Sequence, residues 1–230
     1  MSGSYDLCDM KQKESTAQLD RRKKRALEMN SFLTDLFGSP KTVLNYSTPL
    51  ELLIAVILSA QCTDKMVNQV TEKLFAKYRT LEDYCNADQE EFEQDIRSTG
   101  FYKNKAKSVL TMARKLRDEF GGEVPSSMAQ LITLPGVARK TANVVLGNAF
   151  GIYEGIAIDT HMKRLSNKFH LSDEHDPNKI EQDLMKLLPR EDWFAFTYRL
   201  INYGRTHSPA KKMENYDDPM SIHLKTKNLL

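Results

Sequence analysis

The sequence contains little cysteine and no long apolar segment. Its three cysteines, Cys8, Cys62 and Cys85, are odd in number and unrelated in spacing, which excludes a disulfide framework and a Cys-x-x-Cys metal site. We expect three reduced thiols. The longest apolar run, residues 52–58, is far shorter than the roughly 20 residues of a membrane-spanning helix. The N-terminus lacks the basic-then-apolar pattern of a signal peptide. These absences predict a cytoplasmic protein with no metal site and no membrane contact.

A strong net charge is absent as well. The 230 residues include 33 Lys and Arg against 31 Asp and Glu, a formal charge of +2. No polybasic or acidic tail therefore dominates the chain, although local charge still decides whether nucleic acid binds. Residues 101–170 contain eleven basic and five acidic side chains, whereas residues 81–100 contain seven acidic and one basic. We expect the first segment to face a polyanion and the second to face away from it.

Strand signals are missing too, because no useful length of the chain alternates apolar and polar residues. Apolar residues instead recur at helical spacing, and residues 49–59 are apolar nearly all round, as in a central buried helix. Residues 205–230 have weak periodicity. The pattern predicts an all-α fold with short connections. The expected helices cover residues 21–37, 49–59, 64–78, 88–97, 103–120, 128–132, 139–149, 159–169, 177–187 and 191–203.

One hairpin carries a chemical signal, Leu-Pro-Gly-Val-Ala-Arg-Lys-Thr at residues 134–141. Two helices joined by a Pro-Gly turn leave backbone N–H groups without partners at the positive end of the second helix, where phosphate binds. Gly136 permits close approach of a backbone, and Arg139 and Lys140 add positive charge. A Pro-Gly turn alone is usually an ordinary connection, but these neighbours favour a helix-hairpin-helix that reads the DNA backbone without sequence preference.

Together with three further motifs, this hairpin resembles the endonuclease III family of helix-hairpin-helix DNA glycosylases. The other motifs are residues 58–65 (LSAQCTDK), 100–106 (GFYKNKA) and 158–164 (IDTHMKR). The resemblance runs from about Ser31 to Arg205. It implies two helical lobes flanking a DNA-binding groove.

The resemblance also predicts where the lobes divide. One lobe would be a helix barrel of residues 42–152 that contains the hairpin. The other would be residues 153–230, against which an N-terminal helix within residues 1–41 packs. The expected partner is duplex DNA with a damaged pyrimidine or an abasic site, bound by a monomer. The protein would be located in the cytoplasm, on the nucleoid, in a bacterium or archaeon, or in the nucleus of a eukaryote.

By position, Lys140 matches the nucleophilic lysine of the family and Asp159 its catalytic aspartate. A neutral lysine amine attacks C1′ of the damaged nucleotide and displaces the base, and the resulting imine permits β-elimination. Burial in a cleft and the helix N-terminus would both favour the neutral amine. Asp159 either steadies the cationic transition state or helps deprotonate Lys140. Taken singly, a lysine is usually a surface residue and an aspartate before a helix is usually a cap.

The resemblance assigns DNA contacts to residues beside these two. Gln61 would fill the gap that a flipped nucleotide leaves, and Phe101 would wedge the opposite strand unless it is a core aromatic. Among the lysines near Phe101, Lys105 is our candidate for a phosphate contact. The hairpin contacts would be Gly136, Arg139 and Ala138, which replaces the usual second glycine.

The sequence departs from the family at its C-terminal end. Many relatives carry four cysteines there, which hold a 4Fe–4S cluster. Here Ser208 stands at the first of these positions, and no cysteine follows Cys85. We therefore expect no cofactor of any kind.

Two other functions stay open at this stage. Monofunctional relatives that remove uracil or mismatched thymine typically carry another residue in place of the lysine, so Lys140 favours the bifunctional enzyme. A non-catalytic helix-hairpin-helix DNA-binding protein would be free to lose Lys140 or Asp159, and the sequence retains both.

Overall fold

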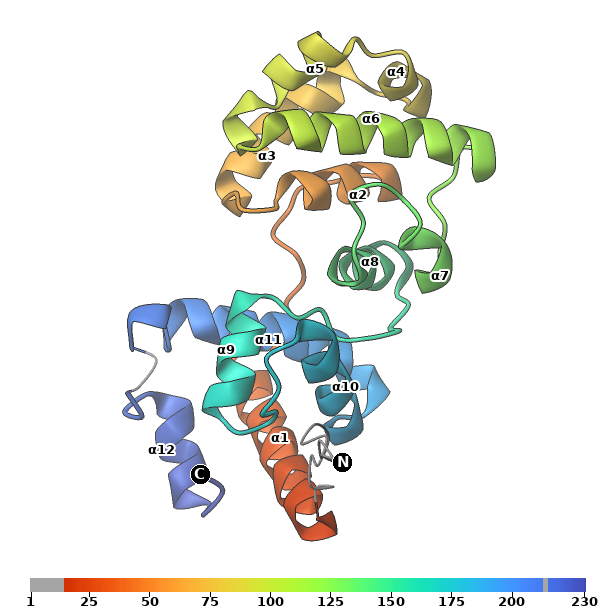
Figure 1. Ribbon diagram of the computed structural model, residues 1–230. Coiled ribbons are helices and arrows are strands. Elements are labelled where there is room, and N and C mark those ends of the chain that lie inside the picture. The colour runs from red at the N-terminus through yellow and green to blue at the C-terminus, as the bar shows by residue number, and fades with distance from the viewer. Residues whose placement is uncertain (1–14, 213–214) are drawn as a thin grey trace, which may run out of the picture.

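A computed structural model of the chain describes residues 15–212 and 215–230. Within these residues every regular element is a helix or helical turn, which confirms the all-α prediction. The helices form two bodies, one above the other in Figure 1. No helix in the described ranges is both long enough and apolar enough to cross a membrane.

The first lobe is built around α2. All residues from Leu52 to Leu58 are buried in it, as a helix without a polar face predicts. Helices α3, α6 and α8 pack around α2, and buried residues from Leu44 to Leu146 form one hydrophobic core. The elements of this lobe are α2 (Pro49–Leu58), α3 (Asp64–Lys77), α4 (Leu81–Cys85), α5 (Gln89–Asp95), η1 (Arg97–Thr99), α6 (Tyr102–Glu119), α7 (Met128–Leu131), α8 (Arg139–Val145) and the π-helical turn η2 (Leu146–Phe150).

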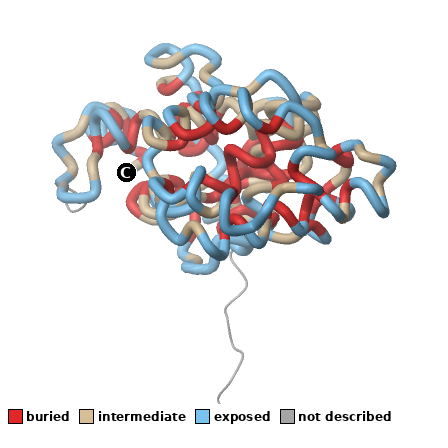
Figure 2. The backbone as a smooth tube through the Cα atoms, turned by 90° about the horizontal axis from the view of Figure 1, so that it is seen from above, coloured by how far each residue is buried: buried red, intermediate tan, exposed pale blue. Residues whose placement is uncertain are grey.

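The second lobe joins the beginning of the described chain to its end. The first helix packs against three helices of the C-terminal half, and residues 26–33 share a core with residues 156–229. Its elements are α1 (Thr16–Phe37), α9 (Thr160–Lys168), α10 (Pro177–Leu187), η3 (Arg190–Asp192), α11 (Trp193–Thr206), η4 (Ala210–Lys212) and α12 (Pro219–Thr226). Figure 2 shows the buried stretches of the backbone inside and the exposed ones at the periphery.

The acidic segment 81–100 forms α4, α5 and η1. Helices α4 and α5 lie at the end of their lobe farthest from the second lobe (Figure 1). They pack on α6, and their exposed acidic side chains include Glu82, Glu90 and Glu91. Most of this negative charge is therefore remote from the junction between the lobes.

Several elements differ from the sequence prediction. Helix α1 begins at Thr16 instead of 21, because Ser15 and Gln18 form a capping box. The helix expected over 139–149 changes into a π-turn at Leu146. Helices α4 and α12 are additions. The Asp218–Pro219 pair caps and starts α12, although its residues lack clear periodicity.

Candidate active site and DNA interface

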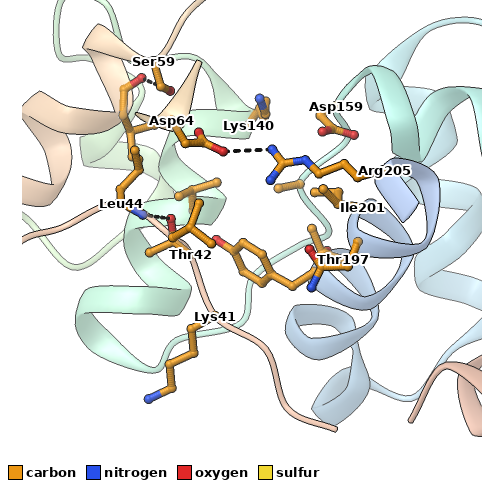
Figure 3. A pocket seen from close by; sticks show the side chains of 16 residues that line it. Lys41, Thr42, Leu44, Ser59, Asp64, Lys140, Asp159, Thr197, Ile201 and Arg205 are labelled. Atoms are coloured by element: carbon orange, nitrogen blue, oxygen red, sulfur yellow. Dashed lines mark hydrogen bonds and ion pairs between the residues drawn. The ribbon is translucent and has the colours of Figure 1, made fainter. Parts of the chain in front are cut away.

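A pocket of about 100 Å³ lies between the lobes and is lined from both of them. Figure 3 shows Lys140, from α8 of the first lobe, and Asp159, from the segment before α9 of the second, at the same end of this pocket. The two residues are nineteen positions apart in sequence and belong to different lobes. The junction therefore brings an amine and a carboxylate to one cavity.

Lys140 is the second residue of α8. The N-cap residue, Ala138, supplies no side-chain hydrogen bond, so the first N–H groups of α8 remain open at the positive end of the helix. Lys140 itself is exposed. The expectation that the protein buries this amine in a cleft is therefore wrong for the chain alone. Lys140 does lie at the N-terminus of α8, as expected. Removal of water from its amine would require a bound partner, because the side chain is exposed.

Asp159 is half-buried and caps α9. Its Oδ1 accepts a hydrogen bond of 2.8 Å from the backbone N–H of Met162. The cap fixes the direction of the side chain, and the second carboxylate oxygen receives no hydrogen bond from the described residues. Asp159 therefore has two roles: one carboxylate oxygen caps α9, and the side chain also lines the pocket.

An ion pair crosses the same pocket. Arg205 of α11 donates to Asp64, the first residue of α3, at 2.9 Å (Figure 3). The sequence motifs gave neither residue a role, although Asp64 lies in the motif of residues 58–65 and the family resemblance ends at Arg205. Tyr198 also lines the pocket. Burial raises the pKa of this phenol to about 12, so Tyr198 is a neutral hydroxyl, and it accepts a hydrogen bond from Asn148.

A second hollow, of about 250 Å³, brings together Gln61, Phe101 and Gly136 from three separate motifs. Gln61 and Phe101 have positive φ angles of 52° and 49°, a conformation that costs energy for residues other than glycine. Phe101 is 64% exposed, which excludes the core-aromatic interpretation. Two strained loops therefore present an amide and an aromatic ring on one surface, next to the hairpin.

The hairpin requires glycine at its tip. Gly136 has a φ of 78°, and a Cβ there would lie 2.9 Å from Cβ of Ser108. Ala138 is exposed just before α8. The side chain of Arg139 is 40% exposed, and its Nε donates to Oε2 of Glu181 at 2.6 Å. The structure therefore places Arg139 at the lobe junction as well as at the surface.

Lys105 contradicts its predicted role as a phosphate contact. The residue is only 5% exposed. Its ammonium donates to the carbonyl of Leu58 at 2.8 Å and to that of Thr99 at 2.7 Å. These carbonyls end α2 and η1, immediately before the loops that carry Gln61 and Phe101. Lys105 is thus an internal tie between the two loops, because helix-end carbonyls lack partners in their own helices.

Ser208 is buried and belongs to a polar cluster of the second lobe. The Nζ of Lys168 donates to Oγ of Ser208 at 3.0 Å, to the carbonyl of Asn215 at 2.7 Å and to Asp218 at 2.7 Å. Tyr203 also donates to Asp218. A buried ammonium, itself paired with a carboxylate, thus donates to the serine at the position that the family resemblance assigns to a cluster cysteine.

The chain is similar to known DNA repair proteins. Residues 54–190 match the model of the HhH-GPD superfamily of base excision DNA repair proteins. Endonuclease III of Synechocystis sp. is 50% identical over 191 residues, which cover 83% of this chain and 87% of that protein. Endonuclease III of Escherichia coli strain K12 is 40% identical over 190 residues, 83% of this chain and 90% of that protein.

Solved structures give the same result. A non-covalent endonuclease III–DNA complex superposes with a TM-score of 0.82 at 40% identity, over 90% of this chain and 98% of that one. A trapped covalent endonuclease III–DNA intermediate superposes with a TM-score of 0.79 at 44% identity, over 82% and 89%.

Fold and site together define a helix-hairpin-helix protein of base excision DNA repair. Within that class the chain belongs to the endonuclease III family. It is a DNA glycosylase and abasic-site lyase that acts on duplex DNA.

Proposed function

We propose that this enzyme removes oxidised pyrimidines with Lys140 as nucleophile. The neutral amine attacks C1′, the bond from C1′ to the base breaks, and the base leaves with a proton. The sugar ring then opens to a protonated imine on Lys140. Loss of a proton from C2′ next expels the 3′ phosphate, and water releases the enzyme. The observation that carries this proposal is the position of Lys140 and Asp159 at one pocket between the lobes.

Bound DNA would supply the desolvation that the free protein lacks. Lys140 is exposed at the N-terminus of α8, and a flipped nucleotide over it would exclude water while the helix dipole disfavours the ammonium. Asp159 would stabilise positive charge at C1′ through the oxygen that the α9 cap does not use.

The pocket must also open to admit a base. Its volume of about 100 Å³ is below the roughly 300 Å³ and more of pockets that enclose a whole ligand. The Asp64–Arg205 pair spans it, so we infer that this pair separates or shifts when a nucleotide enters. Gln61 and Phe101 would occupy the space that the nucleotide leaves in the duplex, which offsets part of the few kcal/mol of lost stacking.

The same proposal assigns the enzyme no iron–sulfur cluster. A 4Fe–4S cluster requires four thiolates, and no cysteine follows Cys85. The side chain of Ser208 accepts from a buried lysine, a surrounding that does not fit a cluster. Iron and sulfide analysis of anaerobically purified protein tests this, and four irons per chain would refute it. Because the relatives quoted above are bacterial, we place the enzyme in the cytoplasm, on nucleoid DNA.

Borohydride trapping on a thymine-glycol duplex tests the proposal. Reduction of the imine should give a covalent protein–DNA adduct with the wild-type protein and none with Lys140→Gln. Lys73→Gln, an exposed lysine on α3, is the matched control and should trap normally. Absence of any adduct with the wild type, or base removal without strand cleavage, would contradict the proposal and favour a monofunctional glycosylase.

A further inference from the structure

Glu181 is a buried carboxylate at the junction of the two lobes. It lies in α10 of the second lobe, and its side chain is only 4% exposed. None of the sequence motifs contains it. A carboxylate in such a place must be hydrogen-bonded to be tolerated, so its partners reveal what it holds together.

The three hydrogen-bond partners of Glu181 come from two different segments of the chain. Oε2 accepts from Nε of Arg139 at 2.6 Å, and Oε1 accepts from Nδ2 of Asn143 at 2.8 Å. Oε1 also accepts from the backbone N–H of Ile156 at 3.2 Å. Arg139 and Asn143 lie one turn apart on α8, directly beside Lys140, and Ile156 lies three residues before Asp159. One carboxylate thus contacts both chain segments that carry the proposed catalytic pair.

The backbone at this point is fitted closely to the carboxylate. A Cβ on Gly155 would lie 1.9 Å from Oε1 of Glu181, and 2.9 and 3.0 Å from the amide atoms of Asn143. Any side chain at this position would push Glu181 or the backbone aside. The absence of a side chain on Gly155 is therefore what allows the Ile156 N–H to reach the carboxylate.

We propose that Glu181 is a positioning residue for the reaction, which sets Lys140 on α8 relative to Asp159. The inference rests on the proposed roles of these two residues. Because Lys140 and Asp159 belong to different lobes, no hydrogen bond within one helix can fix their separation. The carboxylate provides that link, since it binds α8 through two side chains and the Asp159 segment through a backbone N–H.

Glu181→Gln is the most specific variant. Its amide oxygen can still accept from Asn143 and Ile156, but its NH₂ would face the guanidinium of Arg139, so α8 loses its charged contact. Misplacement by about 1 Å costs as much as 100-fold in rate. We expect single-turnover base removal to slow by about 10- to 100-fold, with the dissociation constant for lesion duplex within threefold of wild type.

In Gly155→Ala, the added methyl group would displace Oε1 of Glu181. This variant should therefore show the same kinetic pattern as Glu181→Gln. Glu90→Gln, on the exposed face of α5, is the control and should react as wild type does. Thermal unfolding and duplex binding are measured on every variant, so that the rate is compared at equal folded fraction and at saturating enzyme.

The outcomes separate this inference from the proposed function. A wild-type protein that forms no borohydride adduct would overturn both. A wild type that traps, with Glu181→Gln within twofold of its rate, would overturn the positioning role alone. So would a rate loss fully explained by weaker binding or by unfolding, because that pattern describes a structural residue. A slower rate at unchanged affinity and folded fraction supports the inference.

Discussion

Among the described residues, each lobe contains one buried lysine that ties segments of the chain together, but the two ammonium groups have different partners. Lys105, in the first lobe, donates to two backbone carbonyls. Lys168, in the second, donates to a serine, a carbonyl and the carboxylate of Asp218. Lys105 thus donates only to neutral carbonyls, whereas Lys168 has a counter-charge.

The pKa values reflect this difference. Burial lowers the pKa of Lys105, and no carboxylate opposes that effect. Burial alone would raise the pKa of Asp218, but hydrogen bonds from Lys168, Tyr203 and Ser221 lower it overall. The first lysine is therefore held at an electrostatic cost beside the loops proposed to enter DNA. The second is part of a compensated pair that fastens α12 to α9.

The largest effect should follow from breaking the compensated pair. Asp218→Asn leaves the ammonium of Lys168 buried without a counter-charge and weakens the cap of α12. Removing one partner of a buried pair costs about 3–5 kcal/mol, so we expect the free energy of unfolding in urea to fall by that amount. Asp217→Asn, next in sequence and exposed, should change it little. A loss below about 1 kcal/mol, the range of exposed pairs, would show that the cluster is not a compensated pair.

A smaller effect is expected when the isolated charge is removed. Lys105→Met leaves two carbonyls without a donor, at about 1–3 kcal/mol each, but also removes the cost of burying an ammonium. The net loss of unfolding free energy should therefore be smaller than for Asp218→Asn. Lys107→Met, exposed on the same helix, is the control. Equal losses at Lys105 and Asp218 would refute the distinction between the two lysines.

The pH dependence separates the two sites further. The pKa of Asp218 is depressed below its ordinary 3.8 in the folded protein, so its stabilisation is present above that pH and is lost as pH falls through the lower, folded value. Asp218→Asn should therefore flatten the acid limb of the stability curve. The pKa of Lys105 lies below its ordinary 10.5, so the unfolded chain binds the proton more tightly there. Wild type should gain stability relative to Lys105→Met as pH rises towards 10.5, and a relative loss would contradict this.

These two lysines also mark what the sequence can predict. An apolar segment such as residues 52–58 has no solvent-facing side, so its burial follows from composition. Lys105 lies on an amphipathic helix among other lysines, and that pattern favours solvent. Lys105 is buried because α2 and η1 end beside it. That contact belongs to the tertiary structure and is not visible in the local sequence. The Asp64–Arg205 pair joins residues 141 positions apart, so no local pattern reveals it.

For the candidate site, the sequence identified the catalytic residues but not how exposed they are. Lys140 and Asp159 follow from motifs, and the structure places them at one pocket. The predicted burial of Lys140 fails, because a helix N-terminus at a lobe junction is open until a partner covers it. Asp218 offered a local signal, an N-cap before proline, but the weak periodicity that follows concealed α12. Residues inside the motifs were therefore predictable, whereas the exposure of Lys105 and Lys140 was not, because it depends on how separate elements meet.

The smallest effect on stability is expected at the loops that Lys105 ties. Phe101 is 64% exposed, so Phe101→Ala should leave the free energy of unfolding within about 0.5 kcal/mol of wild type. Phe101→Ala should instead change the rate of the reaction. Without the ring, the duplex regains less stacking when the base is extruded, so removal of thymine glycol from duplex DNA should slow. Cleavage at a preformed abasic site has no base to extrude and should slow less. Measured single-turnover rates that fall equally on both substrates would show that Phe101 acts in binding rather than in extrusion.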